Sequence, residues 1–279
     1  MRVALPPQLV EHAREFAEGR RTPAAPRDAA TVVLMRPGDG GPELYLLRRQ
    51  TSMAFAGGMC VFPGGGVDPR DFDTSVAWSG PAPEIWASHV QTSAEMARAL
   101  VCAAVRETFE ESGVLLAGES AQTVVADTTG EDWESDRAAL EARELAFTEF
   151  LDRRGLVLRT DLLGVWAAWL TPVFEPRRYR TWFFVADLPD GQRTRDDCTE
   201  SDHVTWLPAM QAVRDVEDQQ MVMLPPTYLT CLEVGQHADP AAVLVAAQGR
   251  AVEMFMPAVE DDGMLSVPPR LAALLESRS

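Results

Sequence analysis

Arg106-Glu107-Thr108-Phe109-Glu110-Glu111-Ser112-Gly113-Val114 is the stretch of this sequence that decides the fold. On a helix, Glu107, Glu110 and Glu111 stand at i, i+3 and i+4 and therefore project from one face. Like charges at that spacing repel, but a divalent cation removes the repulsion, and Mg²⁺ and Mn²⁺ prefer hard carboxylate oxygens. The stretch therefore indicates metal-assisted phosphate chemistry. A solvated acidic face, with Arg106 paired to Glu110, is the alternative.

The residues around the acidic cluster predict a helix over 93–112. Apolar side chains recur before the cluster with roughly helical periodicity, at Met96, Leu100, Ala103, Ala104 and Val105. Gly113 follows the cluster at the position where helix C-termini favour glycine. This helix is expected to carry Cys102 on its buried side.

Together with an upstream glycine turn, the acidic stretch resembles the Nudix box, G-x5-E-x7-R-E-U-x-E-E-x-G-U, where U is a bulky aliphatic residue. The upstream half is Val61-Phe62-Pro63-Gly64-Gly65-Gly66-Val67-Asp68, and Thr108 stands where U is usual. The formula places its arginine 14 positions after its glycine, whereas Arg106 lies 41 positions after Gly65, so 27 extra residues interrupt the box. Interrupted boxes of this kind occur in the Nudix branch typified by a peroxisomal coenzyme A diphosphatase, which this sequence resembles.

The extra residues form an insertion at about 69–92. Its turn-forming residues predict a surface loop over 69–89: Asp71, Asp73, Gly80, Pro81 and Pro83. The position eight residues before Arg106, where the formula has its first glutamate, holds Arg98. Glu95, one helical turn earlier, is the candidate to take over part of that role.

The resemblance implies an α/β fold, specifically an α/β/α sandwich with a mixed sheet and a helical C-terminal extension. We expect strands at 30–35, 44–48, 60–62, 163–170, 181–186 and 204–208. The expected organisation is an N-terminal helix and linker over 1–27, a Nudix domain over 28–215 and a mainly helical extension over 216–279. The extension is expected to hold two helices, near 228–234 and 240–248, and to end in a short strand near 252–258, packed on the main domain or against a second copy of the chain.

The resemblance also implies hydrolysis of a pyrophosphate bond in a nucleoside diphosphate derivative. The implied catalytic residues are Arg106, Glu107, Glu110 and Glu111, and the implied Mg²⁺ or Mn²⁺ ligands are the three glutamates. Arg106 would orient a carboxylate through its planar guanidinium. The general base stays open among Glu107, Glu111, Glu200 and Asp202.

The substrate implied by the branch is coenzyme A or acyl-coenzyme A, which would give 3′,5′-ADP and (acyl-)4′-phosphopantetheine. The segment before the box partly resembles that of coenzyme A pyrophosphatases and makes Arg48, Arg49, Gly64, Gly65 and Gly66 the substrate-binding candidates. The alternatives are a Nudix hydrolase of ADP-ribose, NADH or dinucleoside polyphosphates, and a non-catalytic nucleotide sensor. Four aromatic residues are open between stacking an adenine and belonging to the core: Trp166, Trp169, Trp182 and Phe183.

Composition narrows the function classes. A net charge of −17 over 279 residues argues against a broad nucleic-acid surface. The sequence has neither a membrane-length apolar run nor an apolar stretch typical of a secretory signal, so a cytoplasmic protein without membrane contact is expected. The four cysteines are widely spaced and are expected to be ordinary thiols. A small-molecule nucleotide is the expected partner, with a homodimer as an open alternative.

Overall fold

The computed structural model describes residues 5–50, 57–195 and 201–278, and the side chains of 201 and 202 are outside the description. Within these residues the main feature is an eight-stranded sheet. Its main path runs β10 (Ser201–Pro208), β2 (Gly41–Arg49), β1 (Arg27–Gly38), β9 (Tyr179–Asp187), β8 (Leu163–Leu170) and β11 (Met254–Phe255). The short strands β3 (Cys60–Val61) and β4 (Gly64–Gly66) pair with β2 and β1.

The sheet is mixed, as expected. β1 runs parallel to β9, and β11 runs parallel to β8, whereas the β1–β2, β2–β10 and β8–β9 pairs are antiparallel. β1 and β2, which contain the expected strands at 30–35 and 44–48, form a hairpin whose turn lies between Gly38 and Gly41.

Alternate residues of each central strand enter two separate hydrophobic cores, because side chains in a strand point to opposite faces. In β1, Val32 and Leu34 belong to one core, and Val33 and Met35 belong to the other. The four aromatic residues of β8 and β9 are buried in these cores: Trp166, Trp169, Trp182 and Phe183. Their core interpretation is confirmed, and the hypothesis of adenine stacking is wrong.

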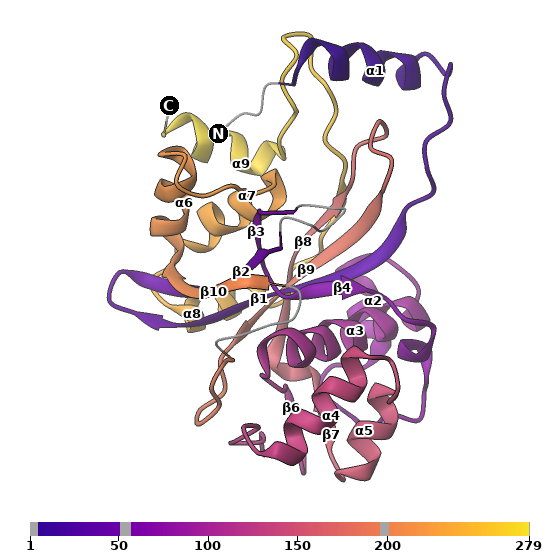
Figure 1. Cartoon of the computed structure of the whole chain (residues 1–279), viewed down its shortest axis with the longest axis vertical. Helices are drawn as coiled ribbons and strands as arrows, with labels where there is room; N and C mark the ends of the chain where they lie inside the picture. The colour runs from indigo at the N-terminus through magenta and orange to yellow at the C-terminus, as the bar shows by residue number, and fades with distance from the viewer. Residues whose placement is uncertain (1–4, 51–56, 196–200, 279) are drawn as a thin grey trace.

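Helices cover both faces of the sheet (Figure 1). The first layer holds α2 (Pro83–Val90), α3 (Ala94–Ser112), α4 (Glu131–Glu141) and α5 (Phe147–Arg153). The second layer holds α6 (Ala209–Glu217), α7 (Pro225–Val234), α8 (Pro240–Ala247) and α9 (Pro269–Glu276). The α/β/α sandwich is therefore confirmed.

Residues after 216 supply most of the second helical layer and the edge strand β11. The helices α7 and α8 match the expected 228–234 and 240–248, but α9 follows the expected terminal strand and was not predicted. The N-terminal helix α1 (Pro7–Ala17) packs separately, through Ala13, against Phe174 and Leu265. The boundary at 215/216 and contact with a second copy remain predictions.

The insertion is folded, so the prediction of a surface loop over 69–89 is wrong. It contains the 3₁₀ helix η1 (Pro69–Phe72), strand β5 (Trp78–Ser79) and α2. Pro83 begins α2 instead of preventing it, since the first turn of a helix tolerates a residue without an N–H. Trp86 is buried at 2% exposure in the first core. A second sheet joins β5 to β7 (Val157–Arg159), which pairs with β6 (Ala117–Gly118); η2 (Thr160–Leu162) follows.

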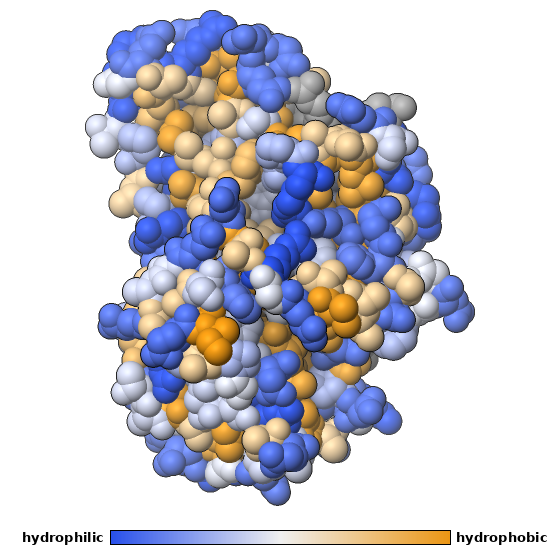
Figure 2. Space-filling model, turned by 180° about the vertical axis from the view of Figure 1, so that it is seen from behind, coloured by the Kyte–Doolittle hydropathy of each residue, from blue (hydrophilic) through white to orange (hydrophobic). Residues whose placement is uncertain are grey.

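Figure 2 shows the hydrophobic residues of one face in small groups between hydrophilic ones. Among the described residues, the exposed large hydrophobic side chains are Ile85, Val222, Val245 and Met256, which lie on different parts of the chain. The described part of the chain contains no helix long and apolar enough to cross a membrane. Cys60, Cys102 and Cys231 are free and buried, as expected for ordinary thiols, and Cys198 lies outside the described residues.

Candidate active site

The helix α3 carries the acidic cluster, and its local signals behave as predicted. Ser93 caps the first turn, accepting a hydrogen bond from the Met96 N–H at 3.2 Å. Gly113 ends the helix with a φ of 75°, a left-handed conformation that glycine adopts without strain. Thr108, the small residue at the U position, is fully buried and donates its hydroxyl to the Ala104 carbonyl at 2.7 Å. Its polarity is therefore satisfied inside the helix.

Arg106 lies at the centre of the site. Its Nη1 donates to Oε1 of Glu107 at 2.8 Å and to Oε1 of Glu110 at 3.2 Å. The side chains of the two glutamates are 14% and 11% exposed, so this is not a solvated acidic face. One guanidinium nitrogen thus holds two carboxylates together near the protein surface.

A fourth carboxylate reaches the site from the insertion. Asp71 of η1 is 2% exposed and accepts two parallel bonds from Arg106, from Nε at 3.0 Å and from Nη2 at 2.9 Å. The planar guanidinium fork matches a carboxylate in this way. Arg106 therefore makes its paired hydrogen bonds with Asp71, which fixes its orientation toward the glutamates.

Asp71 also completes the box when the formula is counted from its glycine. Asp71 is the sixth residue after Gly65, the position of the formula's first acid, with aspartate in place of glutamate. Counting back from Arg106 leads instead to Arg98, which donates to the Thr74 carbonyl at 3.0 Å. Glu95 is exposed in the first turn of α3, about 18 Å along the helix from Glu107 at 1.5 Å per residue. The hypothesis that Glu95 replaces the first acid is therefore wrong.

The glycine turn packs directly on the acidic cluster. The Gly64 N–H donates to Oε2 of Glu111 at 2.8 Å, and the Gly66 carbonyl accepts from Nη2 of Arg106 at 3.0 Å. A Cβ at Gly65 would lie 2.4 Å from the Glu107 carboxylate. The structure thus shows this turn holding the carboxylates, while its contact with substrate remains a prediction.

We expect Gly65→Ala to lower the free energy of unfolding by about 1–3 kcal/mol, because the added methyl group overpacks a well-filled site. The matched control is Gly40→Ala in the β1–β2 turn, where an added Cβ meets nothing within 4 Å. Urea denaturation of both variants tests the prediction. Equal stability of the two variants would contradict the close contact with Glu107.

The cluster carries an excess of negative charge. Burial is the main reason that the pKa of Glu107 is raised to about 7; the charge of Arg106 opposes this effect, and Glu110 and Asp71 add to it. Burial likewise raises the pKa of Glu110, with Asp71 and Glu141 contributing. Three carboxylates on one guanidinium, with Glu111 held by the adjoining glycine turn, therefore favour an additional positive charge.

The donor set fits a divalent metal chemically. Hard carboxylate oxygens, half-buried and in excess over positive charge, suit Mg²⁺ or Mn²⁺. Within the described residues, no three Asp, Glu, His or Cys side chains are already gathered around a common metal position. The structure brings Arg106, Glu107, Glu110 and Glu111 together, and their roles as metal ligands or catalysts remain predictions.

The other candidates lie elsewhere or outside the described residues. Arg48 is exposed near the end of β2, opposite Cys60 of β3, and Arg49 is half-buried opposite Ser201 of β10. Glu200 is outside the described residues, as is the side chain of Asp202. Substrate binding by Arg48 and Arg49, and base catalysis by Glu200 or Asp202, therefore remain predictions.

Arg137 of α4 is a residue of the site that sequence analysis missed. It is 5% exposed, and its Nη1 donates to the Glu110 carbonyl at 2.7 Å and to Oε2 of Glu141 at 2.9 Å. Its Nε and Nη2 donate to the two carboxylate oxygens of Glu134, at 3.0 and 2.8 Å. Arg137 thereby satisfies a carbonyl at the end of α3, where helices leave such groups unpaired.

Comparison with known proteins shows similarity in both fold and sequence. A crystal structure of a Nudix hydrolase from Alicyclobacillus acidocaldarius is 25% identical, with a TM-score of 0.67, and the alignment covers 82% of this chain and 99% of that one. A putative nudix hydrolase 7 from Caenorhabditis elegans is 27% identical over 76% of this chain and 62% of its own length. An acyl-coenzyme A diphosphatase NUDT19 from Xenopus laevis is 25% identical over 67% of this chain and 58% of its own length.

The alignments therefore span less than two thirds of the length of these two relatives. The family model described as the NUDT19 Nudix domain matches residues 82–233, which is more than half of this chain. That span contains the second half of the box, with Arg106 and the three glutamates. The chain belongs to the Nudix family, with a domain of the NUDT19 type.

Proposed function

We propose that this chain hydrolyses the pyrophosphate bond of a nucleoside diphosphate derivative, with coenzyme A or acyl-coenzyme A as the preferred substrate. The observation that carries the proposal is the cluster itself. Glu107 and Glu110 share one guanidinium, Glu111 is held by the glycine turn, and Asp71 orients the arginine. A protein selected only for stability has no reason to crowd four carboxylates at this point.

The proposed reaction joins one water to one phosphorus of the pyrophosphate. The new P–O bond forms as the bond from that phosphorus to the bridging oxygen breaks, and the leaving group departs as a phosphate monoester. The proton of the water passes to a carboxylate, for which Glu107 and Glu111 are the candidates among the described side chains. The products from coenzyme A are 3′,5′-ADP and 4′-phosphopantetheine.

Glu107, Glu110 and Glu111 would hold the Mg²⁺ or Mn²⁺ ion. When bound, the ion neutralises phosphate charge and makes water easier to ionise. Arg106 keeps the carboxylates at fixed positions in the metal-free protein, through its bonds to Asp71 and the Gly66 carbonyl. This arrangement supports a pre-organised site, which costs little reorganisation when substrate arrives.

The choice of coenzyme A rests on two further points. The interrupted box resembles that of the coenzyme A diphosphatase branch, and the Xenopus laevis relative is named an acyl-coenzyme A diphosphatase. That relative is 25% identical to this chain over 67% of the chain's residues.

The test is metal-dependent hydrolysis of coenzyme A, acyl-coenzyme A, ADP-ribose, NADH and diadenosine polyphosphates, with the products identified by mass. We expect turnover only with Mg²⁺ or Mn²⁺, and the highest kcat/KM for coenzyme A or its acyl form, with release of 3′,5′-ADP. A clear preference for another substrate would overturn the proposed specificity. Absence of turnover on the whole panel with either ion would overturn the proposed activity in favour of a nucleotide-binding role.

A further inference from the structure

A cavity of about 350 Å³ lies at the C-terminal end of α3. Its lining includes Phe109 and Gly113 of that helix end, and Trp133 and Glu134 of α4. The segment 193–195, which follows β9, lines the same space. The cavity is of the size that holds small-molecule ligands in proteins.

The lining carries more positive than negative charge. Three arginines border the cavity, Arg137, Arg193 and Arg195, whereas Glu134 is the one carboxylate among its lining residues in the described part of the chain. Arg137 pairs with Glu134 and with Glu141, Arg195 pairs with Glu134, and Arg193 is exposed. On a chain with a net charge of −17, this local excess of guanidinium groups favours an anionic ligand.

The cavity is connected to the acidic cluster through direct contacts. Arg137 lines the cavity and also donates to the Glu110 carbonyl at 2.7 Å. The Arg195 N–H donates to the Ser112 carbonyl at 2.9 Å, so the segment 193–195 closes over the last turn of α3. A ligand in the cavity would therefore lie beside the last turn of α3, the turn that carries Glu110.

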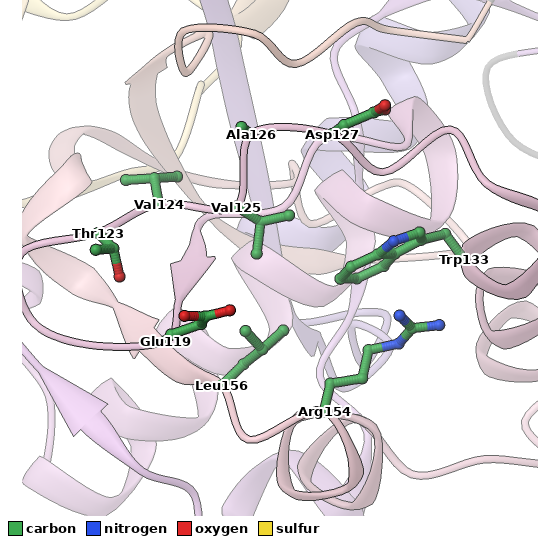
Figure 3. Close-up of a pocket in the computed structure, with 9 residues that line it drawn as sticks. All are labelled: Glu119, Thr123, Val124, Val125, Ala126, Asp127, Trp133, Arg154 and Leu156. Atoms are coloured by element: carbon green, nitrogen blue, oxygen red, sulfur yellow. The ribbon is translucent and has the colours of Figure 1, made fainter.

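A second cavity, of about 510 Å³, also has Trp133 in its lining, but the charged residues that line it are different (Figure 3). Glu119 and Asp127 line it, and its one arginine, Arg154, lies over the Trp133 ring at 3.7 Å from the ring centroid. Arg154 is paired with Asp132 and Asp136. Two carboxylates and a neutralised arginine do not favour an anion, so the first cavity is the better candidate.

We propose that the cavity at the end of α3 binds a phosphate group of the substrate other than the reacting pyrophosphate. Arg193 and Arg195 are the direct contacts, and Arg137 lies in the same lining, paired with Glu134 and Glu141. This inference rests on the proposed function, since the 3′-phosphate of coenzyme A is such a group. It makes Arg193 and Arg195 residues that determine specificity.

The first test is binding, which needs no turnover. Isothermal titration of the full chain with 3′,5′-ADP and with 5′-AMP compares two ligands that differ by one phosphate. We expect 3′,5′-ADP to bind about tenfold more tightly, as one charged contact is worth about a factor of ten. Arg193→Ala and Arg195→Gln should each remove most of that difference, while Arg214→Ala, an exposed arginine of α6, should preserve it.

Equal affinities of the wild-type chain for the two ligands would overturn the proposal, as would an unchanged difference in Arg193→Ala. Arg193 is exposed, so its variant tests the proposal even if Arg195→Gln, which loses the pair with Glu134, folds poorly.

A kinetic test separates this inference from the proposed function. In Arg193→Ala we expect KM for coenzyme A to rise about tenfold, with kcat and the KM for dephospho-coenzyme A changed less than about twofold. If coenzyme A is turned over but the wild-type chain and Arg193→Ala have the same KM for it, the cavity inference fails and the proposed function stands. If no panel substrate is turned over yet 3′,5′-ADP binding still depends on Arg193, the proposed function fails and the cavity remains an anion site.

Discussion

Replacing Glu110 by glutamine is expected to lower kcat on the preferred substrate by about 1000-fold and to leave the fold intact. The loss follows from removing a metal-binding charge, because charge stabilisation by a metal ion is worth several kcal/mol and each 1.4 kcal/mol is a factor of ten. The glutamine amide oxygen can still accept from Nη1 of Arg106, which lies 3.2 Å from the native carboxylate. Steady-state kinetics at saturating Mg²⁺ and circular dichroism measure the two parts of this prediction.

Stability should not fall in Glu110→Gln. Burial raises the pKa of Glu110, so above its ordinary pKa the ionised form disfavours the folded state, and a neutral amide removes that cost. The control is Glu149→Gln on the exposed side of α5, which should keep both activity and stability. Turnover within about threefold of the wild type in Glu110→Gln would remove Glu110 from the proposed metal site.

Replacing Arg106 by alanine is expected to lower the free energy of unfolding of the metal-free protein by about 3–5 kcal/mol, since it leaves a buried acid without its partner. Asp71 at 2% exposure would lose both of its bonds to the guanidinium, and Glu107 and Glu110 would lose their shared cation. The free energy of unfolding of Arg106→Lys should lie between those of the wild type and Arg106→Ala. Lysine keeps the positive charge but loses the planar fork of the guanidinium. Denaturant titrations without divalent ions measure these differences.

A double-mutant cycle assigns the effect to the pair with Asp71. Adding Asp71→Asn to Arg106→Ala should restore part of the stability, with a coupling energy of about 1–3 kcal/mol. Arg14→Ala on α1, where the side chain is 63% exposed, is the control and should change stability by less than about 0.5 kcal/mol. If Arg106→Ala is no less stable than this control, Asp71 is not holding Arg106 in the way described.

Local sequence signals predicted the motif helix and most of the strands. Ser93, the apolar periodicity and Gly113 all act within the helix, so α3 agrees with the expected 93–112 to within one residue. The strands of the main sheet are similarly marked by buried apolar runs, whereas the two helical layers were expected from the resemblance to the Nudix family.

The insertion differs from the expected surface loop because proline also begins helices and aspartate also caps them. Pro83 stands in the first turn of α2, and Asp68 and Asp71 form a capping box around η1. The role of Asp71 was within reach, since the formula counted from Gly65 leads directly to it. Counting from Arg106 failed because the extra residues lie between the acid and the arginine.

Other parts of the site have no local signal. Arg137 contacts Glu110 across 27 positions of sequence, and nothing in the residues around it distinguishes it from other charged residues of α4. The helix α9 has Leu271 and Leu275 at i, i+4 as its buried residues, a pattern too short to stand out from a loop. The role of Arg137 and the formation of α9 both depend on tertiary contacts, which a local sequence pattern does not show.

The parallel pairing of β1 with β9 has a consequence for how this chain reaches its native state. Arg27 lies opposite Tyr179 and Met35 opposite Asp187, so the centre of the sheet joins segments that are far apart in the sequence. Such non-local pairing slows folding, because the entropy of closing a long loop is lost before the contacts form. During synthesis, β1 cannot pair with β9 until β9 has been made. The apolar face of β1 and β2 that packs on α7 and α8 stays uncovered for longer, until those helices have been made. We therefore expect newly made chains to depend on chaperones more than compact proteins built from local contacts do.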